Sequence, residues 1–264
     1  TSIASLFLAG IAPGIMIGLF LMIYAWRQAV RHGYPVAPRM TWRARVIAVT
    51  AAAPAALLPV IILGGILSGI FTPTESAGVA VIYALILSAG VYRQLTWQGL
   101  YEALWQTAFL TAGIMIVVAM ANMVSFVFAV EGVADGIARA MLGISENKIV
   151  LLLLINLVLL LLGMFLEPIS IMILILPVLT LIGAKIGLDP VHLGTIVVLN
   201  VVIGLVTPPV GLCLFITSAI SGVRIEDISR RAIPMVGICV GVLLVVTFVP
   251  EIPLYLPSLY ASYR

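Results

Sequence analysis

Long apolar runs separated by short polar stretches make up most of the chain, and this pattern predicts membrane-spanning helices. A helix needs about 20 mostly apolar residues to cross the hydrocarbon core of a bilayer. Runs near or above that length occupy residues 5–26, 46–71, 73–92, 104–130 and 233–249. Two further apolar regions, 149–185 and 190–222, are each interrupted in the middle by polar residues, glycine and proline. The pattern therefore predicts an all-α polytopic membrane protein with two irregular elements.

The composition agrees with this prediction and excludes a water-soluble globule. Of the 264 residues, 63% are apolar and 9% are charged, whereas soluble domains carry about 25% charged residues. The net charge is +3, and the arginines gather beside apolar runs, which indicates the cytoplasmic side of a membrane rather than a nucleic-acid surface. The two groups are Arg27, Arg31, Arg39, Arg43 and Arg45, and Arg224, Arg230 and Arg231. Counting spans from these groups places the C-terminal tail on the outer side of the membrane.

A T-x-x-E sequence predicts the start of the third helix. It consists of Thr72, Pro73, Thr74 and Glu75. The threonine hydroxyl can accept a bond from the Glu75 amide, the glutamate can accept one from the Thr72 amide, and proline suits the first helical position. This motif fits either a helix cap alone or a turn inside a polar cavity.

The connections between spans support less definite predictions. Residues 93–103 are expected to form a short cytoplasmic connector, and residues 223–232 a basic loop. The run 104–130 fits one long span or a helix broken near Asn122. Residues 133–145 are mildly amphipathic, and we expect them to lie flat at the outer interface.

The first irregular element resembles a re-entrant hairpin. An apolar helix of about fifteen residues ends at Gly163, the polar sequence MFLEPIS follows at 164–170, and a second short helix ends near Lys185. Each arm would rise about 22 Å, less than the roughly 30 Å of the hydrocarbon core. Two kinked full spans are the alternative. Glu167 is a carboxylate within an apolar segment, which suggests ion binding, substrate binding or gating, or else local capping.

The second irregular element is a broken helix. Asp189 and Pro190 predict its N-cap and first position, and the sequence LVTPPVG at 205–211 interrupts it. In a continuous helix, Pro208 and Pro209 would leave the carbonyls four residues earlier without donors. Such carbonyls, with the Thr207 hydroxyl, are hard oxygen ligands suited to sodium, and unpaired backbone is tolerated in a membrane where it lines a cavity or faces protein. A packing kink without ligands is the alternative.

Other polar residues have simpler roles in this interpretation. Asn156 and Asn200 are predicted to form hydrogen bonds between helices. Neither the two histidines nor the two cysteines have metal-ligand spacing, and the cysteines are expected to pack as small apolar side chains. No nucleophile–base pair is visible either, so the sequence does not indicate an enzyme.

Four motifs together resemble a known family. FTPTESAG (71–78), GMFLEP (163–168), GLDPVHLG (187–194) and IGLVTPPVG (203–211) are similar to the C-terminal portion of the large membrane subunit of tripartite ATP-independent periplasmic (TRAP) transporters. The resemblance covers the whole chain in order. It implies one half of an inverted-repeat, elevator-type transporter of the bacterial inner membrane. Because the chain begins at Thr1, we expect it to lack the N-terminal half of the subunit.

The resemblance also implies function, partners and site residues. Sodium ions would drive import of an organic anion, such as sialic acid or a C4-dicarboxylate, delivered by a periplasmic substrate-binding protein. A small membrane subunit would brace the scaffold within the lipid bilayer, and no nucleic acid is involved. The implied sodium site comprises Gly163, Gly204, Thr207 and Val210. The candidates for substrate binding or gating are Glu167, Pro168, Ser170, Pro208 and Pro209.

These predictions combine into one leading hypothesis. Residues 1–147 form scaffold or arm helices, 148–222 form half of a transport domain with the hairpin 149–185 and the broken helix 190–221, and 223–264 form a connector, a final span and a periplasmic tail. The alternatives are another ion-coupled anion permease, of the citrate or arsenite type, and a non-transporting membrane scaffold subunit.

Overall fold

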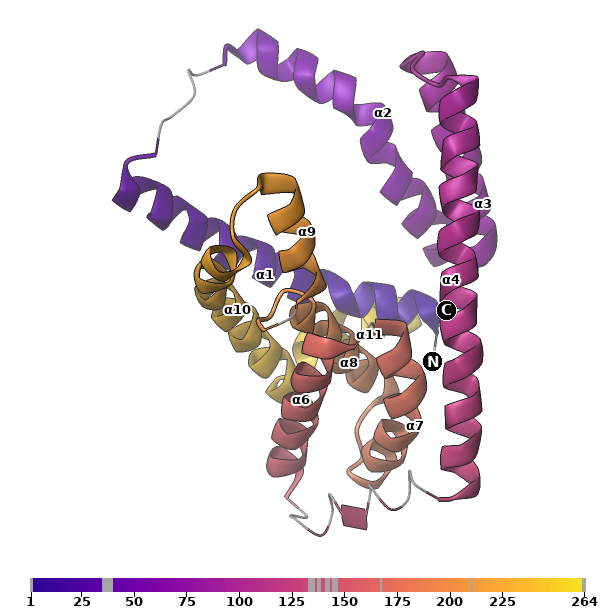
Figure 1. Cartoon of the computed structure of the whole chain (residues 1–264), viewed down its shortest axis with the longest axis vertical. Helices are drawn as coiled ribbons and strands as arrows, with labels where there is room; N and C mark the ends of the chain where they lie inside the picture. Colours follow the sequence, from indigo (N-terminus) through magenta and orange to yellow (C-terminus); the bar gives the residue numbers. More distant parts are fainter. Residues whose placement is uncertain are drawn as a thin grey trace. The chain divides into compact units, whose positions relative to one another are not determined.

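The computed structural model describes residues 2–34, 40–132, 136, 139–140, 143, 147–166, 168–209 and 211–262, and every regular element in these ranges is helical. Seven described helices are long and apolar enough to cross a membrane. The prediction of an all-α polytopic membrane protein is therefore confirmed. The elements (Figure 1) are α1 (Ile3–His32), α2 (Trp42–Leu67), α3 (Pro73–Ile86), the π-helical turn η1 (Leu87–Val91), α4 (Trp97–Val130), α6 (Lys148–Phe165), α7 (Pro168–Lys185), α8 (Pro190–Gly204), α9 (Leu212–Ser221), α10 (Ile225–Phe248) and α11 (Glu251–Ser262).

The chain divides into two compact units. One unit comprises Thr1–Arg31 and Ile114–Arg264, and the other comprises His32–Gly113. The first, which we call the main unit, contains both irregular elements predicted from the sequence. The second, the small unit, contains α2, α3 and η1.

Within the small unit, α2 packs against α3 through polar and apolar contacts. The Tyr83 hydroxyl donates to the Pro54 carbonyl (2.9 Å), and the Tyr92 hydroxyl donates to the Ala51 carbonyl (3.0 Å). The predicted capping box begins α3: the Thr72 amide donates to Glu75 Oε2 (2.8 Å), and the Glu75 amide donates to Thr72 Oγ1 (3.3 Å). The sequence prediction for this helix start is confirmed in detail.

The long run before residue 131 forms one continuous helix. α4 extends from Trp97 to Val130 over 34 residues, a rise of about 51 Å. The alternative of a break near Asn122 is therefore wrong. Residues 97–103 belong to this helix, so the connector predicted over 93–103 is shorter than expected. Most of the amphipathic segment predicted over 133–145 lies outside the described residues.

At the centre of the main unit, α8 contacts α6, α7, α10 and α11. Because α8 has neighbours on several sides, most of its residues are buried, and its exposed large apolar residues are Val198 and Val202 on one stripe of the helix. The core is formed by Leu152, Ile155 and Leu159 of α6, Ile171, Val178, Leu179 and Ile182 of α7, Leu193, Ile196, Val197 and Val201 of α8, and Leu188. This packing holds the predicted hairpin arms against the first half of the broken helix.

The two hairpin arms, α6 and α7, lie side by side and meet at a short tip (Figure 1). Each is 18 residues long, a rise of about 27 Å, which is close to the thickness of a hydrocarbon core. Each arm is thus longer than the sequence predicted, and its length no longer favours a re-entrant hairpin over a full span. The re-entrant hairpin stays a prediction, as does its alternative of two full spans.

The basic residues lie largely within helices instead of in loops. Arg27 and Arg31 belong to the end of α1, and Arg43 and Arg45 to the start of α2, while Arg39 falls outside the described residues. α10 begins at Ile225, so the predicted basic loop over 223–232 is mostly the first part of a helix. The helices continue past the apolar runs because arginine is a good helix former.

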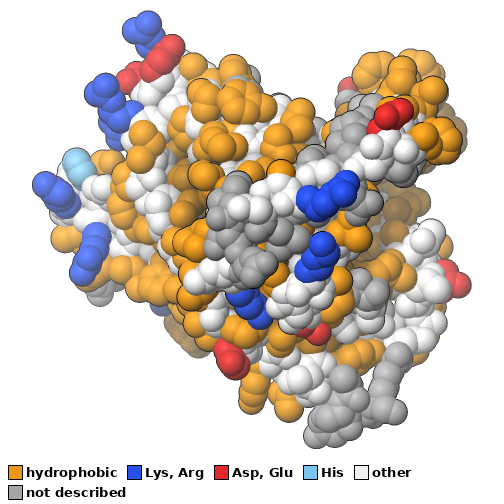
Figure 2. Space-filling model, turned by 90° about the horizontal axis from the view of Figure 1, so that it is seen from below, with side chains coloured by type: hydrophobic (Ala, Val, Ile, Leu, Met, Phe, Trp, Pro, Cys, Tyr) orange, Lys and Arg blue, Asp and Glu red, His pale blue; other side chains and the backbone are white. Residues whose placement is uncertain are grey.

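Apolar side chains cover most of the coloured surface in Figure 2, and charged side chains occur singly or in small groups. Many large apolar side chains are exposed within the chain, among them Trp97 (85%) and Ile220 (83%). A water-soluble protein does not expose so many, whereas lipid or neighbouring membrane helices can cover them.

Loss of the Thr72 hydroxyl should destabilise the start of α3. We expect Thr72→Ala to lower the free energy of unfolding by about 1 kcal/mol, because one helix amide loses its acceptor. Thermal unfolding of the purified protein in detergent measures this change. Thr74→Ala, in the same helix turn but outside the capping bonds, serves as the control and should change little. Equal unfolding temperatures for the two variants would contradict a stabilising role of the box.

Candidate functional site

The main unit has a point where two helix backbones touch, at Gly163 of α6 and Gly204 of α8. A methyl group placed on Gly204 would lie 2.5 Å from both the Cα and the carbonyl carbon of Gly163. A methyl group placed on Gly163 would lie 3.1 Å from the Gly204 Cα. Only glycine allows this approach, since any side chain would push the helices apart. Two residues of the implied sodium site are therefore in direct contact.

The break between α8 and α9 begins immediately after this contact. The helix ends at Gly204, and Gly211 adopts a left-handed conformation (φ +51°) before α9 begins. The Gly211 amide donates to the Met164 carbonyl (3.4 Å), which ties the break to the end of α6. The break and the hairpin tip thus form one local structure, built from segments about forty residues apart.

The structure corrects the prediction that two carbonyls in this segment lack donors. The Gly204 carbonyl accepts from the Thr207 amide (3.0 Å), and the Leu205 carbonyl accepts from the Cys213 amide (3.1 Å). The helix ends before the prolines. The chain then turns, so that amides at other positions donate to these carbonyls. Each carbonyl oxygen has a second lone pair, which can still bind another donor or a cation.

The other predicted site residues are placed as follows. Thr207 is buried and donates its hydroxyl to the Ile203 carbonyl (2.6 Å). Pro208 is half-buried and joined to the exposed Pro209 by a cis peptide bond. Pro168 and Ser170 lie half-buried in the first turn of α7. Val210 and Glu167 lie outside the described residues.

A buried polar cluster links α6, α8 and α10 close to this site. Asn200 Nδ2 donates to Asn156 Oδ1 (2.7 Å), which confirms the predicted bond between helices. Asn156 Nδ2 donates to Thr247 Oγ1 (3.1 Å). All three side chains are at most 3% exposed. Sequence analysis missed Thr247, because its partner Asn156 is 91 residues away along the chain.

A cavity of about 810 Å³ adjoins the break. Val206 of the break lines it, as do Cys213 and Thr217 of α9. α10 contributes Asp227 and Arg231 to its lining. The predicted burial of the cysteines is confirmed for Cys239, whereas Cys213 is half-buried. The site thus borders a space that contains both apolar and charged side chains.

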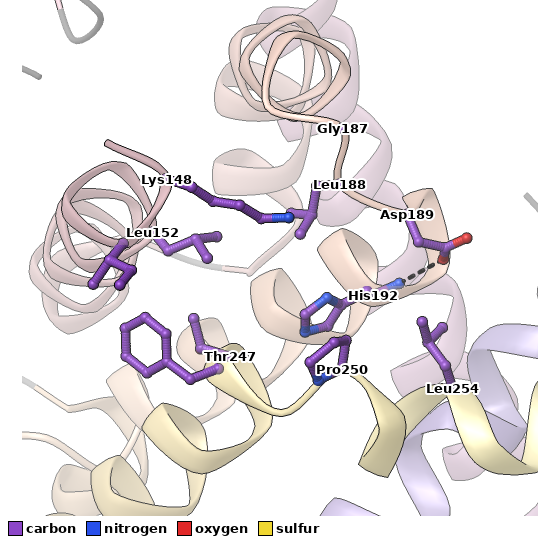
Figure 3. Close-up of a pocket in the computed structure, with 11 residues that line it drawn as sticks. Lys148, Leu152, Gly187, Leu188, Asp189, His192, Thr247, Pro250 and Leu254 are labelled. Atoms are coloured by element: carbon purple, nitrogen blue, oxygen red, sulfur yellow. Dashed lines mark hydrogen bonds between the residues drawn. The ribbon is translucent and has the colours of Figure 1, made fainter. Parts of the chain in front are cut away.

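A second cavity, of about 650 Å³, lies where α6 and α8 begin (Figure 3). Lys148 and Asp189 are its charged lining residues. Asp189 Oδ1 accepts from the amides of Val191 and His192, so the predicted N-cap is confirmed. His192 is buried, and its Nε2 lies 2.9 Å from the Val246 carbonyl. This histidine therefore connects α8 to α10.

The donor set around the break suits a hard cation. Among the described residues, no group of three or more His, Cys, Asp or Glu side chains could hold a metal ion. The oxygen atoms present in the break include the Thr207 hydroxyl oxygen and the carbonyl oxygens of Gly204 and Leu205, each of which retains a second lone pair. Neutral hydroxyl and carbonyl oxygens fit sodium and do not favour a transition metal.

Comparison with known proteins identifies the family. Residues 1–252 match the model of the "tripartite ATP-independent periplasmic transporter, DctM component". The chain belongs to this family. The resemblance drawn from the four sequence motifs is therefore confirmed, and the DctM component is the large permease subunit of TRAP transporters.

Several relatives are TRAP transporter permeases named for different substrates. The isethionate TRAP permease of Oleidesulfovibrio alaskensis is 39% identical, over 96% of this chain and 40% of its own length. The sialic acid TRAP large permease of Vibrio cholerae is 38% identical, over 100% of this chain and 62% of its own length. The C4-dicarboxylate TRAP large permease of Pseudomonas aeruginosa is 38% identical, over 98% of this chain and 60% of its own length. The chain thus spans between 40% and 62% of the length of these relatives.

Gly204 should tolerate no side chain. We expect Gly204→Ala to destabilise the folded protein by about 1–3 kcal/mol or more, because its methyl group would overlap the Gly163 backbone. Thermal unfolding and the yield of folded protein measure the effect. Gly237→Ala in α10 is the control, since a methyl group there meets no atom within 4 Å. Normal stability of Gly204→Ala would show that the two helices are not in contact.

Proposed function

We propose that this chain forms half of a sodium-coupled transport site in a TRAP transporter of the bacterial inner membrane. The observation that carries the proposal is the junction at Gly163 and Gly204, where the end of one predicted hairpin arm meets a broken helix. Broken helices at the membrane midplane commonly bind the coupling ion and the substrate in secondary transporters. The family membership supports transport in place of an enzymatic activity.

The ion site would use Thr207 and the backbone of the break. The single hydroxyl proton of Thr207 bonds to the Ile203 carbonyl, so the lone pairs of its oxygen are left for a cation. Gly163, Gly204 and Val210 would supply carbonyl oxygens. Bound sodium would add positive charge beside the path of an anion. The contact between the two glycines holds the end of α6 against these ligands.

The substrate would be a small organic anion. Relatives are named for isethionate, sialic acid and C4-dicarboxylates, which all carry an acidic group. Glu167, Pro168 and Ser170 at the hairpin tip, with Pro208 and Pro209 in the break, are the candidates for substrate contact or gating. Arg231 of the cavity beside the break is a further positive charge in the same region.

The working transporter would contain more than this chain. A periplasmic binding protein would deliver the anion, and a small membrane subunit and the other half of the large subunit would complete the scaffold. The transport-domain half, residues 148–222, would then move against the scaffold helices in an elevator motion, and the C-terminus of the chain would lie in the periplasm. The exposed apolar surface of the helices supports contact with lipid and with such partners.

Sodium dependence tests the proposed coupling. We expect uptake of the matching anion into proteoliposomes, in the presence of the binding protein, to fall to the level of protein-free liposomes when choline replaces sodium. The same gradient of potassium should not restore uptake. Undiminished uptake without sodium would refute the coupling, and uptake without any binding protein would favour another class of anion permease.

Thr207 should set the sodium affinity of transport. We expect Thr207→Val to raise the sodium concentration for half-maximal uptake about tenfold or more, since the cation loses one oxygen ligand. Thr207→Ser keeps the hydroxyl and should stay near the wild type. Thr195→Val in α8 is a matched control, because Thr195 is also buried and its hydroxyl donates to the Val191 carbonyl of its own helix (2.8 Å). An unchanged sodium response in Thr207→Val would exclude the hydroxyl as a ligand.

A further inference from the structure

The cluster of Asn156, Asn200 and Thr247 lies between the second cavity and the glycine contact. Thr247 lines the cavity of Figure 3, while Asn200 lies one helical turn before Gly204. Asn156 lies two turns before Gly163. Residues separated by four or seven positions share one face of a helix. The faces of α6 and α8 that carry the asparagine bond are therefore the faces that carry the glycine contact.

The bonds of this cluster fix three helices relative to one another. Asn200 Nδ2 bonds to Asn156 Oδ1 (2.7 Å) and also to the Ile196 carbonyl of its own helix (2.8 Å). Asn156 Nδ2 bonds to the Leu152 carbonyl (2.9 Å) as well as to Thr247 Oγ1 (3.1 Å). Each amide is thus held by its own helix and by a neighbour. A slip of one residue along α6 or α8 would break the bond between them.

Packing alone does not account for Asn200. Its side chain is fully buried, and its Oδ1 accepts no hydrogen bond from the residues that the structure describes. An unsatisfied buried acceptor destabilises the folded state, whereas an apolar residue at this position would avoid that cost. Such a cost is typical of positions that serve function rather than stability.

We propose that Asn156 and Asn200 are positioning residues that set the register of α6 against α8, so that the hairpin tip meets the break in the geometry needed for ion coupling. This inference rests on the proposed function for its link to sodium. The hydrogen bond between the asparagines is directional, so it fixes one register of the two helices. Contacts among Leu, Ile and Val alone are not directional and permit sliding and rotation. Thr247 extends the same constraint to α10.

Sodium-dependent uptake by the intact transporter tests this role. We expect Asn156→Ala and Asn200→Ala each to raise the sodium concentration for half-maximal uptake roughly 3- to 10-fold, the range expected from one lost buried hydrogen bond. The double variant should equal the more affected single variant, because both substitutions remove one shared bond. Unchanged sodium responses, or effects that multiply, would overturn the inference.

Two further variants separate positioning from folding. Thr247→Val removes only the hydroxyl and should shift the sodium response in the same direction by roughly 2- to 3-fold. Thr195→Val is the matched control: Thr195 is also buried in α8, but its hydroxyl bonds to the Val191 carbonyl of the same helix (2.8 Å). A purely structural cluster would reduce the amount of folded transporter and leave the sodium response of the folded fraction unchanged.

Hydrogen exchange provides a measurement that does not depend on sodium. In the wild type, the amides of Thr207 and Cys213 bond within the break. We expect peptides covering residues 203–214 to exchange several-fold faster in both asparagine variants than in Thr195→Val. Unchanged exchange would refute the positioning role whatever the uptake result. Faster exchange with sodium-independent uptake by the wild type would support positioning and refute the proposed coupling instead.

Discussion

The contact between the backbones of Gly163 and Gly204 is the constraint on which the rest of the site depends. It brings the end of α6 within van der Waals distance of the end of α8, where no side chain fits between them. In a membrane, apolar side chains gain little from helix association, so close backbone packing and interhelical hydrogen bonds provide the driving force. Both are present here on the same faces of α6 and α8, and the break begins directly after them.

The backbone carbonyls at the start of the break already have hydrogen-bond donors within the protein. The carbonyls of Gly204 and Leu205 accept bonds from amides of Thr207 and Cys213, as a medium without water requires. A cation at this place would therefore bind second lone pairs and a hydroxyl oxygen, in addition to existing bonds. Since these bonds form without a cation, the segment is folded before any ion binds. A cation that left them intact would not have to order the chain on binding.

The parts of this structure that sequence predicts best are local. The cap residues Thr72 and Asp189 act on amides two or three positions away, and both predictions are correct. For Asn156 and Asn200 the sequence predicted hydrogen bonds between helices, because a buried amide in a membrane needs a partner, but it did not indicate that the two residues bond to each other. The carbonyl partners within the break were predicted wrongly. The rule for proline assumes a continuous helix, and this helix ends at Gly204.

Contacts between distant segments were the least predictable. The family resemblance placed Gly163 and Gly204 in one site but did not indicate that their backbones touch, and the partner of Asn156 in α10 is 91 residues away. Helix ends were also uncertain where charged residues continue a helix beyond its apolar run, as at the start of α10. In these cases packing and helix propensity extend the element, whereas the hydropathy pattern marks only the part suited to the bilayer interior.

The helices that form the site are more buried within the chain than α2 and α4, which precede them. A third of the most apolar stretch of α6 and of α10 is buried, whereas none of that of α2 or of α4 is. α2 and α4 are apolar on all sides, so their surfaces suit lipid or other membrane polypeptides. The hydrogen bonds and the glycine contact that shape the candidate site lie between α6 and α10, and α1 adds apolar packing through Ile17 and Leu21. The geometry of the site is therefore specified mainly by the last part of the chain, and α2 and α4 offer surface through which the chain would join a larger assembly.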